Sequence, residues 1–372
     1  MRNIDIKMKL KLIVGLIGVL SLSSFSTLPS SDDTDKKEQE NWVIGPFHRP
    51  EGVNPVLTPQ PTSFYCPMRK EQVKWEESDI FNPAATVKDG KIVVLYRAED
   101  NSAQGIGKRT SRIGYAESVD GVTIKRFDSP VLFPGGDDFE NIECPGGCED
   151  PRVAMTEDGL YVMLYTAWNR KTPRLAVATS RDLKNWTKHG LAFEKAYDGR
   201  FARIATKSAS MLTKVKGGKL VIDKVDGKYF MYWGEHAVYA ATSDDLVNWT
   251  PILDEKNELA TVIKPRPQYF DSALTECGPP AILTDKGIVL LYNGKNQTND
   301  SKRDKRFTAG AYCAGQLLTD PKEPMKVLQR LDVPFFRPMA SFEKSGQYVD
   351  GTVFIEGLVF FKNKWYLYYG CA

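Results

Sequence analysis

Short apolar runs that end near a tyrosine recur along the chain and form its strongest pattern. The five runs read KIVVLYRAED, LYVMLYTAW, KYFMYWGEH, GIVLLYNGK and KWYLYYGCA, and their tyrosines are Tyr96, Tyr165, Tyr232, Tyr292 and Tyr368. The intervals between these tyrosines are 69, 67, 60 and 76 residues. Each run follows a turn signal and is dominated by β-branched and aromatic residues, whereas the 3.6-residue period of a helix is weak. The pattern therefore predicts β-strands at regular intervals.

A second repeat lies between these strands. SRDLKNWT begins at Ser180 and SDDLVNWT at Ser243, 63 residues later, and a weaker copy, SVDGVTI, begins at Ser118. Two strands joined by a tight turn, with two more strands before the next pair, describe a four-stranded blade. Five such units predict an all-β fold, a five-bladed β-propeller. A β-sandwich is the alternative, but it does not require the regular spacing.

Composition and charge indicate an ordinary globular protein. The 372 residues are 42% hydrophobic and 26% charged, which is enough for a sizeable core. The formal net charge of the chain is +3, and the first eleven residues alone carry a net charge of +3. The rest of the chain is therefore close to neutral. Neither a nucleic-acid partner nor a membrane-surface partner is indicated.

The N-terminus has the order of a secretory signal peptide, which we assign to residues 1–28. Basic residues precede the apolar stretch 12–22, and a small polar run follows it. That stretch is shorter than the roughly 20 residues of a membrane-spanning helix. We therefore expect export to the periplasm or the exterior, with no membrane insertion of the mature chain. Residues 29–45 are expected to be a flexible segment and residues 46–372 the propeller domain.

The cysteines and histidines give no metal-binding pattern. Cys144 and Cys148 flank PGG, the other four cysteines are scattered, and the chain has three histidines. A zinc site needs closer pairs of these residues, so we predict neither a metal nor another cofactor. A local disulfide and free thiols both remain compatible with the sequence, which also leaves the oligomeric state open.

Polar residues recur just before or within the first strand of the predicted blades. In GGCEDPRVAM, Glu149 and Asp150 precede an apolar run, and an Asp-Pro pair alone commonly opens a turn. In a propeller, however, the first strand of each blade lines the central channel. The residues at equivalent places are Asn82, Asp150, Glu276 and Asp350. The following strands end at the same rim and add Arg97, Glu99, Asp100, Trp168, Glu235 and His236.

Such a funnel of carboxylates and aromatic rings suits a sugar. Trp168, Trp233 and Tyr239 are candidates for stacking on pyranose rings. One carboxylic acid can protonate the glycosidic oxygen, and in an inverting hydrolase a second carboxylate, roughly 6.5–9.5 Å away, activates water. The alternative for any single acid is a turn cap or an ion pair with Arg97 or Arg152.

The motifs FNPAA, LYRAED, GCEDPRV, DLKNWT, AGQLLTDP and YYGCA together resemble glycoside hydrolase family 130, from about residue 75 to the end. This family comprises β-mannoside phosphorylases and β-mannosidases, and its fold is a five-bladed β-propeller. The resemblance implies that Asp150 is the general acid, which in the phosphorylases is thought to act through a mannose hydroxyl. It also implies that Asn82 and Arg97 bind the mannose that is cleaved off.

The family divides by nucleophile, which is phosphate or water. The presence of both Glu235 and Glu276 resembles the β-1,2-mannosidase branch of the family. A carboxylate near the nucleophile repels phosphate but can accept a proton from water. We therefore predict an inverting hydrolase of β-1,2-linked manno-oligosaccharides, with Asp150, Glu235 and Glu276 as catalytic residues. The predicted substrate-binding residues are Asn82, Arg97, Asp100, Arg152, Lys207, His236 and Asp350.

Two other functions remain open at this point. Arg152, Lys207 and His236 are possible phosphate ligands, which would make the protein a phosphorylase releasing mannose 1-phosphate. A non-catalytic glycan-binding propeller is the other alternative. Family members continue past YYGCA with an aspartate and a closing strand, whereas this sequence ends at Ala372. We expect either a truncated C-terminus or a propeller closed differently, for example by residues before Phe81.

Overall fold

The computed structural model describes residues 41–371, so the predicted signal peptide lies outside the described residues. Trp42 and Ile44 are buried in a core cluster with Val289, Leu291 and Ile355. The packed chain therefore begins before the predicted domain boundary at residue 46. Within the described part of the chain, no helix has the length and apolar character needed to cross a membrane.

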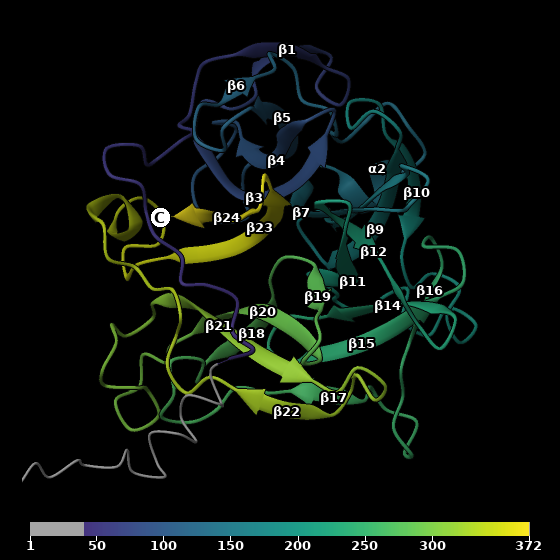
Figure 1. The fold of residues 1–372 in the computed structure, drawn as a ribbon. Coiled ribbons are helices and arrows are strands. Elements are labelled where there is room, and N and C mark those ends of the chain that lie inside the picture. Colours follow the sequence, from purple (N-terminus) through teal and green to yellow (C-terminus); the bar gives the residue numbers. More distant parts are fainter. Residues whose placement is uncertain (1–40, 372) are drawn as a thin grey trace, which may run out of the picture. The chain divides into compact units, whose positions relative to one another are not determined.

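Residues 42–371 form five antiparallel blades around a central axis (Figure 1). Blade 1 consists of β3 (Asp79–Lys88), β4 (Lys91–Glu99), β5 (Ser111–Ser118) and β6 (Lys125–Arg126). Blade 2 consists of β7 (Gly147–Met155), β8 (Tyr161–Trp168), β9 (Pro173–Ser180) and β10 (Thr187–Leu191). Blade 3 consists of β11 (Ala209–Lys216), β14 (Lys228–Trp233), β15 (Val238–Ser243) and β16 (Trp249–Pro251), with the short strands β12 (Lys219–Ile222), β13 (Lys224–Val225) and β17 (Thr261–Ile263).

Blades 4 and 5 complete the ring. Blade 4 has an interrupted inner strand, β18 (Leu274–Cys277) and β19 (Ala281–Leu283), followed by β20 (Ile288–Lys295), β21 (Tyr312–Thr319) and β22 (Val327–Arg330). Blade 5 consists of β23 (Val353–Phe361) and β24 (Lys364–Cys371). The remaining elements are the hairpin β1 (Ser63–Cys66) and β2 (Glu71–Lys74), the helical turn α2 (Glu140–Glu143) and the 3-10 turn η1 (Ser341–Lys344).

The inner strands are neighbours in chain order, and the ring closes between the last blade and the first. β3 contacts β7, β7 contacts β11, and β11 pairs in parallel with β19. β23 contacts both β20 and β3. This arrangement confirms the predicted five-bladed β-propeller. The five tyrosine-containing runs are the strands β4, β8, β14, β20 and β24, which confirms the repeat on which the prediction rested.

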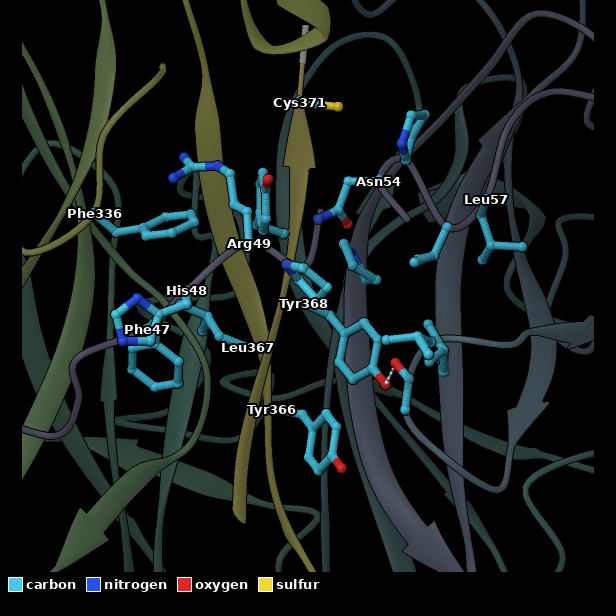
Figure 2. A pocket seen from close by; sticks show the side chains of 18 of the residues that line it. Phe47, His48, Arg49, Asn54, Leu57, Phe336, Tyr366, Leu367, Tyr368 and Cys371 are labelled. Carbon is cyan, nitrogen blue, oxygen red and sulfur yellow. Dashed lines mark hydrogen bonds between the residues drawn. The ribbon is translucent and has the colours of Figure 1, made fainter. Parts of the chain in front are cut away.

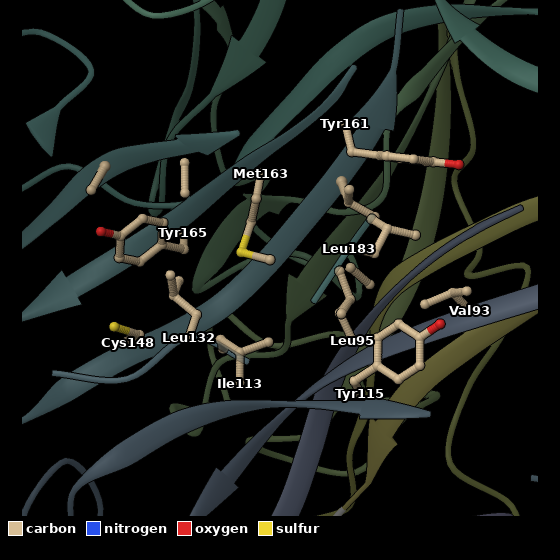
Figure 3. Close-up of a cluster of buried hydrophobic side chains, with 14 of the residues drawn as sticks. Val93, Leu95, Ile113, Tyr115, Leu132, Cys148, Tyr161, Met163, Tyr165 and Leu183 are labelled. Carbon is tan, nitrogen blue, oxygen red and sulfur yellow. The ribbon is translucent and has the colours of Figure 1, made fainter. Parts of the chain in front are cut away.

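The repeated tyrosines are core residues that face small residues, on the next strand in blades 1 to 4 and on the preceding strand in blade 5. Tyr96 lies opposite Gly114, and a Cβ atom on that glycine would be 2.3 Å from the tyrosine ring. Tyr292 and Gly315 repeat the relationship, with 2.4 Å for the same contact. Figure 3 shows how side chains of blades 1 and 2 interdigitate around Tyr165 in one of the resulting core clusters.

The second repeat forms the turn between the third and fourth strands of a blade. In blade 2, Ser180 accepts the amide of Leu183, and the Trp186 indole donates to the Leu183 carbonyl. The copy in blade 3 makes the same two bonds with Ser243, Leu246 and Trp249. The sequence similarity thus reflects one turn geometry used twice.

Blade 5 has an open side. Among the described residues, β24 pairs with β23 alone, and a mainly apolar cavity of about 610 Å³ lies beside β24 (Figure 2). Residues 45–57 border this cavity, and Arg49 packs 4.0 Å from the Phe336 ring centre. The segment before Phe81 therefore lies along blade 5, as one of the two expected closures requires, but without pairing to β24. All six cysteines lie in the described part, and they are free thiols.

Candidate active site

Three inner strands interrupt their regular pairing at their fourth residue. In β3, β7 and β23 the register shifts around Asn82, Asp150 and Glu356, respectively. Asn82 and Asp150 both have φ of 49°, a left-handed conformation that is uncommon for residues other than glycine. A β-bulge re-aims the side chain of the extra residue, and bulges are frequent next to active sites. Sequence spacing alone did not show these bulges.

Asp150 lies where three predicted site residues converge. Its Oδ1 accepts hydrogen bonds from Asn82 Nδ2 at 2.8 Å and from Arg97 Nη1 at 2.9 Å, and its Oδ2 lies 3.2 Å from Lys207 Nζ. Only 1% of Asp150 is exposed. Burial alone would raise the pKa of Asp150, but the Lys207 and Arg97 cations outweigh it and hold that pKa well below its usual range.

Arg97 is surrounded by carboxylates. Its Nη2 donates to Glu99 Oε1 and to Glu149 Oε1, each at 2.7 Å, and the Ser111 hydroxyl contacts the same two oxygens. Burial raises the pKa of Glu149 to about 7, against the lowering effect of Arg97 and with a further increase from Asp150. The pair formed by Glu149 and Asp150 therefore prefers a single negative charge near neutral pH.

Lys207 links Asp150 to the second predicted carboxylate. Its ammonium lies 3.2 Å from Asp150 Oδ2 and 3.8 Å from Glu276 Oε1. These two distances limit the separation of the two oxygens to at most about 7 Å, which reaches the lower end of the roughly 6.5–9.5 Å between the carboxyl groups of inverting glycosidases. Ser208, just before β11, also donates to Glu276 Oε1. Burial raises the pKa of Glu276 to about 7, with Lys207 lowering it and Glu235 raising it.

Glu235 and His236 follow the end of β14. Glu235 is half-buried, and its carboxylate is close enough to Glu276 and Lys207 to influence the pKa of each. His236 is exposed, and its carbonyl accepts a bond from Thr275 Oγ1. The predicted catalytic residues Asp150, Glu235 and Glu276 thus belong to one electrostatically connected group.

Two of the predicted substrate-binding residues, Arg152 and Asp100, have other partners in the structure. Arg152 is fully buried, and its guanidinium is engaged by the carbonyls of Asp150 and Cys277. The Asp100 carboxylate is taken up by Arg112 and by amides of its own loop, so it stabilises that loop. Asp350 is exposed and lies before β23. The contacts of Arg152 and Asp100 do not support a role for these two side chains as sugar or phosphate ligands.

The position in blade 5 that corresponds to Asn82 and Asp150 is held by Glu356, which sequence analysis missed. Glu356 is the fourth residue of β23, as Asn82 is of β3 and Asp150 of β7. The strand VFIEGLVFF carries the signal, because its glutamate interrupts an apolar run. Aligning DGTVFI by its aspartate selected Asp350 instead.

The aromatic residues are also distributed differently from the expectation. Trp233 is 2% exposed and packs between Phe193 and Tyr239, so it belongs to the core. The Trp168 indole donates to the Gly107 carbonyl at 2.9 Å and supports the loop above it. Tyr312 and Tyr348, which were not predicted, form an edge-to-face pair at 6.2 Å. Burial and the nearby Glu276 raise the pKa of Tyr312, which places this pair beside the carboxylates.

The described residues contain no group of three or more His, Cys, Asp or Glu side chains that could hold a metal ion. The carboxyl groups of the cluster can carry out acid–base chemistry. The pKa of Asp150 is held well below its usual range and that of Glu276 is raised to about 7, so the two carboxyl groups differ in protonation at neutral pH.

Comparisons with known proteins identify relatives of this chain. The model of glycoside hydrolase family 130, described as beta-1,4-mannooligosaccharide phosphorylase, matches residues 57–372. A 1,2-beta-oligomannan phosphorylase from Thermoanaerobacter sp. is 32% identical over 310 residues, covering 82% of this chain and 90% of that protein.

Two solved structures are more similar. A structure from Bacteroides ovatus ATCC 8483 is 73% identical, with a TM-score of 0.85, and the match covers 89% of this chain and 94% of that one. Another is 64% identical, with a TM-score of 0.88 and coverage of 89% and 92%. This second structure represents work showing that the GH130 family of mannoside phosphorylases contains glycoside hydrolases that target beta-1,2 mannosidic linkages in Candida mannan.

Proposed function

The chain belongs to glycoside hydrolase family 130, and from this membership we propose that it is an inverting hydrolase that cleaves β-1,2-linked manno-oligosaccharides with water. The 64% identical structure described for hydrolases of β-1,2 mannosidic linkages supports this choice of reaction and linkage. The observation that carries the proposal is the charge balance around Lys207.

The cations at the site are already balanced by carboxylates. Lys207 lies between Asp150 and Glu276, and Arg97 is shared by Asp150 and two glutamates. Arg152, the other candidate for an anion ligand, is buried against backbone carbonyls. A phosphate dianion entering this cluster would meet carboxylates at short range, and like charges 4 Å apart repel by about 4 kcal/mol at an effective dielectric constant near 20. Neutral water avoids that repulsion.

The proposed roles follow from the contacts. Asn82 and Arg97 hold the mannose, and Asp150 supplies the proton to the leaving oxygen. Glu276, assisted by Glu235, takes a proton from the attacking water, for which a pKa of about 7 is well matched. Asp150 must first gain a proton itself. A mannose hydroxyl that separates Asp150 from Lys207 would weaken their ion pair and raise the pKa of Asp150 toward the working range.

Phosphorolysis is the second candidate, and the names of the curated relatives favour it. The relatives at 32% and 30% identity are a 1,2-beta-oligomannan phosphorylase and a beta-1,2-mannobiose phosphorylase. A chain that used phosphate would need the positive charge of Lys207 to be available to the anion. The contacts of Lys207 with Asp150 and Glu276 argue against that availability.

A product assay tests the proposal. The purified protein is incubated with β-1,2-linked and β-1,4-linked manno-oligosaccharides in phosphate-free buffer and again with added phosphate. Hydrolysis predicts free mannose from the β-1,2 substrate in both buffers, released initially as the α-anomer because a single displacement inverts the configuration. Mannose 1-phosphate as the main product would establish the phosphorylase alternative. Sugar binding without any cleavage would indicate a glycan-binding propeller.

We also propose that the protein is exported. The basic, apolar and small-polar order of residues 1–28 supports this localisation. Cell fractionation combined with N-terminal sequencing of the native protein tests it. A cytoplasmic protein that retains Met1 would contradict the proposal.

A further inference from the structure

Arg152 ties together the two carboxylates to which we assign chemistry. Its Nη1 donates to the carbonyl of Asp150 at 3.0 Å, and its Nη2 donates to the carbonyl of Cys277 at 2.9 Å. The first carbonyl belongs to the proposed proton donor, whose backbone is in the left-handed region. The second follows Glu276 directly in the chain. A single guanidinium therefore bridges the bulge of blade 2 and the interrupted inner strand of blade 4.

Glu356 is the carboxyl group that packs against this guanidinium. Its Oε1 lies 2.9 Å from Arg152 Nη2, and Glu356 is fully buried. Neither Glu356 oxygen makes a hydrogen bond to a described residue, so the approach to Arg152 is its one close polar contact in the described part of the chain. A buried carboxyl group with so few partners destabilises a fold, so its presence calls for a reason beyond packing.

The position of Glu356 in the fold supplies that reason. Glu356 occupies the bulge of blade 5, where blades 1 and 2 carry Asn82 and Asp150, both of which belong to the site. Its protonation is also coupled to the site, since burial raises its pKa well above the usual range, Arg152 lowers it, and Asp150 and Glu276 raise it further. Glu356 thus lies within the electrostatic reach of both proposed catalytic carboxylates without touching the open part of the site.

We propose that Glu356 is a positioning residue that, through Arg152, sets the spacing and charge of Asp150 and Glu276. The inference rests on the proposed function for the roles of those two carboxylates. With Glu356 in place, the Arg152 fork is fixed against both carbonyls. Without it, a buried guanidinium lacks its carboxyl partner and shifts toward other acceptors, which moves the bulge and the Glu276 strand relative to each other.

Three variants at the pair and one control separate positioning from general stability. Glu356→Leu removes the contact with Arg152, whereas Glu356→Gln keeps an oxygen acceptor of the same shape. Arg152→Lys keeps the charge but cannot form a fork to two carbonyls. The control is Glu76→Leu, because Glu76 is an equally buried carboxylate that pairs with Arg126 at 2.9 Å on the outer side of blade 1.

The expected result is a selective loss of turnover. Glu356→Leu and Arg152→Lys should lower kcat by about 10- to 100-fold with little change in KM, because displacements near 1 Å at a catalytic centre have effects of this size. Both should also move the pH profile of kcat, since Arg152 influences the pKa of Asp150 and of Glu276. Glu356→Gln should recover most of the activity. Glu76→Leu should lower Tm while kcat and the pH profile stay at wild-type values.

The outcomes that overturn the proposal are equally definite. A Glu356→Leu protein that loses only Tm, as the control does, gives Glu356 a purely structural role. If that variant does not fold, an Arg152→Lys protein with wild-type kcat and pH profile gives the same answer. If the wild type cleaves no mannoside, the proposed function fails by itself. In that case, crystal structures of the wild type and of Glu356→Leu test the positioning role separately. An unchanged distance between the Asp150 and Glu276 carboxyl groups overturns that role.

Discussion

Lys207 and Asp150 form an ion pair, with Nζ 3.2 Å from Oδ2, although one precedes the inner strand of blade 3 and the other lies in the bulge of blade 2. The pair is nearly shielded from solvent, as Asp150 is 1% exposed and the Lys207 side chain 19%. The proposed proton donor is therefore charged before substrate binds. Substrate binding must both seat the mannose and loosen this contact.

Asp150→Asn should reduce kcat by several orders of magnitude, because an amide keeps the shape of the carboxylate but cannot donate its proton. The amide oxygen can still accept from Asn82 and Arg97, so mannose affinity and the fold should be mostly retained. Steady-state kinetics, calorimetric sugar binding and thermal unfolding measure the three quantities. Parallel losses of Tm and activity would instead assign Asp150 to a structural ion-pair network.

Glu276 should control the acidic side of the pH profile. A general base must be ionised, and the pKa of Glu276 is raised to about 7. Activity should therefore be present above about pH 7 and fall as the pH drops through that value. Glu276→Gln should abolish hydrolysis over the whole range, since the amide cannot accept the proton. A wild-type profile that is flat between pH 5 and 8 would exclude this role.

The propeller could be predicted from the sequence because its signal is local and repeated. Tyr96 and Tyr292 each occupy the second strand of a blade and face a glycine on the third, so strand, turn and packing recur with a nearly constant spacing. The turn motif at Ser180 recurs at Ser243 for the same reason. Regular repetition of this kind needs no knowledge of long-range contacts.

The site was only partly predictable, because its residues meet across blades. Asn82, Arg97, Asp150 and Glu276 were found through motifs and through the phase of the inner strands. Glu356 escapes the sequence analysis because the alignment by the aspartate of DGTVFI selects Asp350, before the strand, whereas the bulge of β23 lies within it. Arg152 was assigned to the ligand because its burial depends on the carbonyl of Cys277, which is 125 residues away in sequence.

Gly114 tests the packing of the repeat. The Cβ atom of Gly114→Ala would lie 2.3 Å from the Tyr96 ring, so the substitution should destabilise the fold by about 1–3 kcal/mol. Urea unfolding measures the change. In a double-mutant cycle, Tyr96→Leu should relieve the clash, so the double variant should lose less than the two single variants together. Additive losses would show that the ring and the glycine are not in contact.

Water and phosphate can be separated by changing the charge beside Lys207. Glu276→Gln and Glu235→Gln each remove one carboxylate that repels a phosphate dianion, while Lys207 stays in place. If the wild type is a hydrolase for the reason given, both variants should lose hydrolysis. Glu235→Gln together with Glu276→Gln should acquire weak affinity for phosphate, which isothermal titration with inorganic phosphate detects. The matched control is the same double variant with Lys207→Met, which should show no phosphate binding.

The size of the expected effect follows from the distances. A carboxylate about 4 Å from an incoming unit charge costs about 4 kcal/mol at an effective dielectric constant near 20, or about a thousandfold in affinity, and a dianion faces more than one such group. Wild-type protein should therefore release free mannose at a rate that added phosphate does not increase. Phosphate-dependent turnover by the wild type would mean that Lys207 leaves Asp150 and Glu276 to bind the anion. The two glutamates would then be sugar ligands, and the nucleophile would be phosphate.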